Sequence, residues 1–264
     1  MPDSRLKKHL DDLYKQYNTT SFIENDPIRF VHRYSGSTNN QEVVGFIVST
    51  LAFGQRRIMI PFMDKVLSHL SSDPYDAIIT WKIKDIESLK LLVYRFIKGI
   101  DIVVLLYRMR GVLKTYGSIE SLFKEGYEKT NSLQFAMSKF VEIFNSVKLP
   151  DDLSQQSESR GRNLSFLLPS PNRKSACKRF HLFLRWMVRK DSVDVGLWKS
   201  IPEADLMIPL DTHVAKISKE LKLTKRSNLD WKMAEEITNN LKALDPTDPA
   251  KYDFALFGYG LNRK

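Results

Sequence analysis

Asp–Pro pairs recur along the sequence, and three of them have the form of a helix start. Asp26-Pro27, Asp73-Pro74 and Asp248-Pro249 place a capping carboxylate before a proline, which suits the first helical position. No stretch shows the sustained period-two alternation between hairpin turns that predicts a sheet. We therefore predict an all-α protein.

Hydrophobic spacing supports this prediction along most of the chain. Leu6, Leu10, Leu13 and Tyr17 recur at helical spacing, and residues 43 to 53 are apolar nearly all round, as in a helix buried inside a bundle. Residues 149 to 165 are polar and contain a glycine, so we expect a mobile loop there. Further helices are expected near 56 to 70, 101 to 116, 118 to 127 and 131 to 147.

The charge balance favours a polyanionic partner. The 264 residues include 41 Lys and Arg against 31 Asp and Glu, which gives a formal charge of +10. Nucleic acid is the commonest such partner, because each neutralised phosphate releases condensed counterions. Anionic membranes and acidic proteins fit the same charge, so the balance alone leaves all three open.

Several classes of site and location are excluded by what the chain lacks. Cys177 is the only cysteine, so the chain can form no internal disulfide and no four-thiolate zinc or iron–sulfur site. The histidines show no metal-ligand spacing, so we expect neither a metal nor another cofactor. Residues 1 to 10 lack the apolar core of a secretory signal, and no apolar run approaches the roughly 20 residues of a membrane span. We expect a cytoplasmic protein without a membrane partner.

The segment from 174 to 190, KSACKRFHLFLRWMVRK, predicts an amphipathic helix with a cationic stripe. At about 100° per residue, one face carries the stripe, and the opposite face is apolar and suited to packing. A cationic stripe suits a phosphate backbone, but a merely solvated face fits equally well. The stripe contains Lys174, Lys178, His181, Arg185 and Arg189, and the apolar face contains Ala176, Phe180, Phe183, Leu184 and Met187.

A second informative segment is IPLDTHVAKISKEL, in which an apolar approach ends at Asp211 and an amphipathic helix begins. Asp211 is predicted to be an N-cap. Amides at a helix end and the helix dipole favour the charged form of a carboxylate, so capping is compatible with a catalytic role. The proline-punctuated turn LLPSPNRK, before the basic helix, is either a phosphate cradle or a simple connector.

These two segments together carry a resemblance to a known superfamily. LPSPNRKSA at 168 to 176, followed by IPLDTHVAKI at 208 to 217, resembles the hairpin LPGVGxKxA and the later VDTHV of the helix-hairpin-helix base-excision DNA glycosylases (HhH-GPD). The whole chain is also similar to an uncharacterised bacterial family assigned to that superfamily. The resemblance implies two helical domains with a DNA-binding cleft between them. We expect residues 36–195 to form one domain, with the hairpin near 167–178, and residues 1–35 plus 196–264 to form the other.

The resemblance also implies roles for particular residues. Asp211 matches the catalytic aspartate, and Lys174 matches the lysine that is the nucleophile in bifunctional members, with Lys178 as a second candidate. A carboxylate can stabilise the positive charge that develops on the sugar, and neighbouring cations favour the unprotonated amine that attack requires. The expected DNA contacts are Arg173, Arg179, His181, Arg185, Arg189 and His213, with Gln55, Arg56 and Arg57 at or beside the gap left by a flipped base.

One departure from the family pattern keeps alternatives open. Ser170 and Asn172 replace the hairpin glycines, and Pro171 removes an amide that could bind phosphate. The first hypothesis is a monomeric DNA glycosylase, with or without AP-lyase activity, acting on double-stranded DNA. The alternative is a non-catalytic binder of distorted DNA or structured RNA, or a protein-interaction module, using the same basic face.

Overall fold

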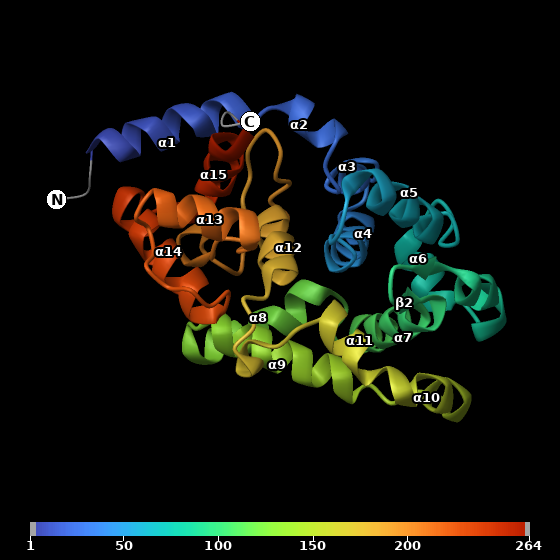
Figure 1. Cartoon of the computed structure of the whole chain (residues 1–264). Helices are drawn as coiled ribbons and strands as arrows, with labels where there is room; N and C mark the ends of the chain where they lie inside the picture. The colour runs from blue at the N-terminus through green and yellow to red at the C-terminus, as the bar shows by residue number, and fades with distance from the viewer. Residues whose placement is uncertain (1–3, 262–264) are drawn as a thin grey trace. The chain divides into compact units, whose positions relative to one another are not determined.

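A computed structural model describes residues 4–261 as a helical chain with one short hairpin (Figure 1). The chain divides into two compact units, a central unit of Phe30–Pro169 and a terminal unit of Met1–Arg29 with Ser170–Lys264. Residues 1–3 and 262–264, which belong to the expected terminal domain, lie outside the described residues. No helix among residues 4–261 is long and apolar enough to cross a membrane.

The boundaries of the units differ from the expected ones. Residues 170–195 were expected in the central domain, but the structure groups them with both ends of the chain; residues 30–35, expected in the terminal domain, belong to the central unit. The reason is that the side chains of this segment bond within the terminal unit. Arg185 binds Asp253, and Arg189 binds Asp248.

The central unit is built around α4 (Thr38–Thr50), whose residues 40 to 50 are all buried. Ser37 caps this helix by accepting a bond from the Asn40 amide at 3.3 Å. The expectation of a helix buried all round is thus confirmed. The other elements of the unit are α3 (Arg29–His32), α5 (Arg56–Leu67), α6 (Pro74–Thr80), η1 (Ile83–Leu91), β1 (Val93–Tyr94), β2 (Ile97–Lys98), α7 (Gly99–Tyr116), α8 (Ile119–Thr130), α9 (Leu133–Ser146), α10 (Asp151–Ser157), η2 (Glu158–Arg160) and α11 (Gly161–Leu167).

The terminal unit joins the first helix to the last. Helix α1 (Ser4–Tyr17) lies along α15 (Tyr252–Leu261), drawn blue and red in Figure 1, and Leu10 and Leu13 of α1 are buried. Gly258 makes this approach possible, because a Cβ there would lie 2.0 Å from the Tyr17 ring. The other elements are α2 (Thr20–Glu24), η3 (Pro171–Arg173), α12 (Lys178–Val188), η4 (Glu203–Asp205), α13 (Thr212–Glu220), α14 (Trp231–Leu244) and η5 (Pro249–Lys251).

The predicted helix starts and helix ranges are largely present. The Asp73 carboxylate caps α6 by accepting a bond from Asp76, and Asp248 caps the short helix η5. Asp26 instead accepts a bond from the Ile28 amide in a turn, and α3 begins later, at Arg29. The helices expected near 56, 101, 118 and 131 correspond to α5, α7, α8 and α9.

The loop expected over residues 149 to 165 is wrong, because the structure has α10, η2 and α11 there. Leu153 and Leu167 are buried and anchor the segment, while its many polar residues face solvent. Arg160 adds a second anchor, since its Nε donates to the fully buried carboxylate of Asp101 at 2.7 Å. With so few apolar residues, the segment lacks the periodicity by which a helix is predicted.

A two-stranded antiparallel hairpin was also missed. Strands β1 and β2 pair Val93 with Lys98 and Tyr94 with Ile97. Arg95 at the tip has a φ of +57°, in the left-handed region that favours glycine. Two-residue strands are too short to show the alternation on which a sheet prediction depends.

Candidate active site at the start of helix α13

Asp211 occupies the N-cap of α13, as predicted. Its Oδ1 accepts bonds from the backbone amides of His213 at 2.9 Å and Val214 at 2.8 Å. The chain reaches it through buried residues, and the Ile208 amide donates to Thr238 Oγ1 at 3.1 Å. This anchored approach fixes the position of the helix start and therefore of the carboxylate.

Lys178, the first residue of α12, lies against the other oxygen of the same carboxylate. Its Nζ is 2.8 Å from Asp211 Oδ2, and the two side chains are 38% and 33% exposed. Burial raises the pKa of Asp211, but the Lys178 ammonium and the two helix amides outweigh it, so the pKa lies below its ordinary value. Asp211 is thus an ionised, oriented carboxylate that solvent can still reach.

His213 lies on the exposed side of the same helix start. A Cβ on Gly260 of α15 would meet His213 Nε2 at 2.1 Å, so the imidazole rests directly against the backbone at this glycine. The absence of a side chain at position 260 therefore leaves the space that the His213 ring occupies. The structure places His213 beside Asp211 in sequence and in space.

The turn before α12 contains two residues whose backbone lies in the region that favours glycine. Lys174 has a φ of +61° and Cys177 a φ of +45°, both in the left-handed region. The Lys174 carbonyl accepts a bond from the Trp231 amide at 3.1 Å, which ties this turn to the start of α14. Arg173 and Lys174 are exposed, and Lys178 rather than Lys174 forms the ion pair with Asp211.

The cationic stripe of the basic helix is not a solvent-facing surface, and this prediction is wrong in its main part. Arg179, His181, Arg185 and Arg189 are buried, so they cannot contact a phosphate backbone as expected. The apolar face from Ala176 to Met187 is buried as predicted. Helix α12 is therefore enclosed on both faces, and only Lys178 of the stripe on α12 remains partly exposed.

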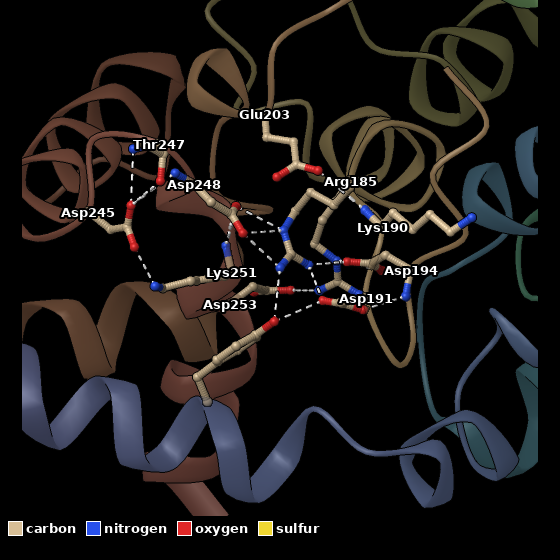
Figure 2. Close-up of polar contacts among 12 residues, drawn as sticks. Arg185, Lys190, Asp191, Asp194, Glu203, Asp245, Thr247, Asp248, Lys251 and Asp253 are labelled. Carbon is tan, nitrogen blue, oxygen red and sulfur yellow. Dashed lines mark hydrogen bonds and ion pairs between the residues drawn. The ribbon is translucent and has the colours of Figure 1, made fainter. Parts of the chain in front are cut away.

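Four carboxylates of the terminal unit neutralise the two stripe arginines. Two of them, Asp191 and Asp194, follow α12 closely in the sequence, and the other two, Asp248 and Asp253, come from the C-terminal part of the chain (Figure 2). Arg185 Nε lies 3.3 Å from Asp194 Oδ1, and its Nη1 bonds to Asp253 on α15. Arg189 bonds to Asp194, to Asp191 at 2.8 Å and to Asp248 at 2.9 Å. Although burial lowers the pKa of Arg189, these carboxylates raise it overall. We call this set the buried ion network.

The buried ion network extends electrostatically to the Asp211 site. Burial raises the pKa of the Asp253 carboxyl, Arg185 lowers it, and the negative charge of Asp211 raises it further. Asp194 and Asp253 were not predicted as partners of the arginines, because they lie in segments without a motif. Among the described residues, no group of three or more His, Cys, Asp or Glu side chains is arranged to hold a metal ion.

Gln55, Arg56 and Arg57 belong to the central unit, at the start of α5, and all three are exposed. Gln55 is the N-cap residue, and its Oε1 accepts a bond from Arg57 Nε at 3.0 Å. These side chains are therefore accessible to a ligand, as the expected DNA contact requires.

Fold and site define a predominantly helical protein with an ion-paired aspartate at a helix N-cap. Over residues 26–262 the chain matches the family described as "Protein of unknown function (DUF2400)", and it belongs to that family. Neither the curated proteins nor the solved structures contain a significant match to the chain.

Proposed function

We propose that this protein is a base-excision DNA glycosylase of the helix-hairpin-helix type, with Asp211 as its catalytic carboxylate. The observation that supports the proposal is the arrangement of that carboxylate, ionised, oriented through both oxygens and one-third exposed. The formal charge of +10 agrees with a DNA partner. The finer fold expectation, a glycosylase-like pair of helical domains, is part of this proposal.

Cleavage of the bond between the sugar and the base is favoured by a fixed negative charge near the sugar. When the bond between C1′ and the base nitrogen breaks, its electrons leave with the base and positive charge develops on the sugar. Asp211 can stabilise that charge and can accept a proton from the water whose oxygen bonds to C1′. Lys178 and the amides of α13 keep the carboxylate ionised for this task.

A lyase step would need an unprotonated lysine in place of water. Lys178 is a poor candidate in the resting arrangement, because its Nζ is already held by the Asp211 carboxylate at 2.8 Å. Lys174 is exposed and lies four residues earlier, in the turn before α12. We therefore assign the attacking amine of a bifunctional reaction to Lys174.

The enzyme hypothesis is tested by base release from a panel of lesion-containing duplexes. Asp211→Asn keeps a capping side chain but removes the charge, so we expect release to fall by roughly 100-fold or more. Asp230→Asn is a matched control, since Asp230 also caps a helix, α14, and also forms an ion pair, with Arg226 at 3.5 Å. Equal loss in both variants, or undiminished release by Asp211→Asn, would overturn the catalytic assignment.

The lyase step is tested separately by borohydride trapping on damaged-base and abasic duplexes. We expect cross-linking to be lost in Lys174→Ala and kept in Lys178→Ala. Loss in Lys178→Ala alone would transfer the role to Lys178. If the unmodified protein does not cross-link, it has no lyase step through an amine; if both variants cross-link normally, neither Lys174 nor Lys178 is the nucleophile.

A second candidate is a non-catalytic binder of distorted DNA or structured RNA. It is favoured by the turn at η3, where Pro171 lacks an amide and no glycine allows close approach of a phosphate. Failure of the unmodified protein to release any base, with retained binding to distorted duplexes, would select this function. Competition between duplex DNA and structured RNA at several salt concentrations would then identify the nucleic acid.

A further inference from the structure

Three phenylalanines form a partly exposed aromatic cluster on the central unit. Phe53 follows α4, Phe96 is at the tip of the β1–β2 hairpin, and Phe166 is in α11. The ring centroids of Phe166 lie 4.9 Å from those of Phe53 and of Phe96, in edge-to-face geometry. Phe96 is 46% exposed and Phe166 is 38% exposed. We call these three residues the aromatic cluster.

Ring contacts and hydrogen bonds hold the aromatic cluster in place. The Phe53 ring also contacts Tyr94, at 4.9 Å, and Tyr94 stacks on the buried Phe62 at 4.7 Å. The backbone carbonyl of Phe96 accepts bonds from Arg160 at 3.0 Å and Asn163 at 3.1 Å. A rigid aromatic surface loses little conformational entropy when it binds a flat ligand.

All the charged residues in the segments that carry the aromatic cluster are cationic. Residues 53–58 (FGQRRI), 93–98 (VYRFIK) and 160–166 (RGRNLSF) contain six arginines and lysines and no aspartate or glutamate. Arg160 is offset by Asp101, and the other five cationic residues are exposed. Those five are Arg56, Arg57, Arg95, Lys98 and Arg162.

We propose that the aromatic cluster binds unpaired bases of single-stranded nucleic acid, with the surrounding cations on the flanking phosphates. Every base has a π face that can stack on an exposed ring, and the phosphates supply the charge that these segments lack. A protein partner would need compensating acidic groups of its own, whereas a nucleic acid strand carries aromatic and anionic groups at every residue. This binding needs no contribution from Asp211 and goes beyond base excision.

The first test uses Phe96→Trp as a fluorescent reporter. The chain has four tryptophans, and all four are buried, so a tryptophan at position 96 would be the exposed one. We expect oligodeoxythymidylate or oligouridylate to quench its emission by stacking. Phe135→Trp on α9 is the matched control, because Phe135 is 42% exposed and stands outside the aromatic cluster. Equal response of the two variants, or no quenching at position 96, would overturn the proposal.

The second test measures the affinity for the same labelled strands by fluorescence anisotropy. Phe96→Ala and Phe166→Ala should each weaken binding by roughly 5- to 150-fold, as expected for the loss of one stacked base, and Phe135→Ala should not. Circular dichroism melting checks that each variant is folded, and Phe96→Trp should retain binding even if Phe96→Ala unfolds. Unchanged affinity in the folded alanine variants would contradict the proposal.

Two further arms separate this site from other ligands and from the proposed enzyme. Vesicles of phosphatidylcholine and phosphatidylserine test a membrane surface, and a blue shift of the Phe96→Trp emission with vesicles, without quenching by oligonucleotides, would refute nucleic acid binding there. Asp211→Asn should bind the single strands normally. Failure of base release therefore leaves this proposal standing, and failure of strand binding leaves the enzyme proposal standing.

Discussion

Replacing His181 with leucine should make the protein less sensitive to mild acid. His181 is 1% exposed, and neither ring nitrogen has a hydrogen-bond partner among the described residues. Its ring lies 5.2 Å from that of Trp231. Burial lowers the pKa of His181 from 6.5 to about 3, so the folded protein holds the ring neutral. A cation at this position has no carboxylate to pair with in the described contacts.

The size of the effect follows from proton linkage. Below pH 6.5 the unfolded chain binds a proton at His181, but the folded chain does not until about pH 3, so stability falls as the pH falls through this window. Between pH 7 and pH 5 the loss is about 2 kcal/mol, at about 1.4 kcal/mol per unit of pH. Leucine cannot titrate, and it also removes two buried nitrogens that lack partners, which each cost about 1–3 kcal/mol.

Urea unfolding at pH 7 and pH 5, followed by tryptophan emission, measures this difference. We expect His181→Leu to be at least as stable as the unmodified protein at pH 7 and to lose about 2 kcal/mol less on acidification. His213→Leu is the control, since His213 is exposed. The reasoning fails if His181→Leu keeps the full pH dependence, or if NMR shows the His181 ring titrating near pH 6.5.

Three further predictions concern stability. Arg189→Ala should lower the free energy of unfolding by about 3–5 kcal/mol in urea, because it leaves Asp194 buried with one guanidinium fewer; a loss under 1 kcal/mol would contradict this. Gly258→Ala should cost about 1–3 kcal/mol by calorimetry, because the new methyl group would overlap the Tyr17 ring. Burial raises the pKa of Asp245, but its hydrogen bonds lower it overall, so its stabilisation is present above about pH 4 and lost in stronger acid. Asp245→Asn should therefore flatten the stability profile below pH 4, and an unchanged profile would exclude this role.

The helices were predictable from the spacing of their apolar residues, but the surroundings of the polar face of α12 were not. Periodicity correctly identified α1, α4 and the apolar face of α12. It could not reveal that Arg185 and Arg189 pair with carboxylates, because Asp253 and Asp248 come from a distant segment and Asp194 lies in a loop without periodicity. The sequence pattern of a cationic stripe is the same whether the stripe faces water, phosphate or aspartate.

The centre of the candidate site was predictable because it depends on local chemistry. An aspartate between an apolar approach and an amphipathic helix predicts an N-cap, and Asp211 is one. The ion pair with Lys178 was not predicted, because a long connection separates the two residues; the resemblance had offered Lys178 only as a second candidate nucleophile. The aromatic cluster was not predicted, because its three rings come from segments that carry no shared motif.

The pairing of α1 with α15 has a consequence for the order in which this protein is made. A ribosome releases the chain from its N-terminal end, so α1 emerges early and must wait for α15, the last helix described, before it can bury Leu10 and Leu13. The central unit is continuous in sequence and can finish folding during that interval. Once the central unit has folded, chaperones would therefore meet the exposed apolar side of α1 rather than the central unit.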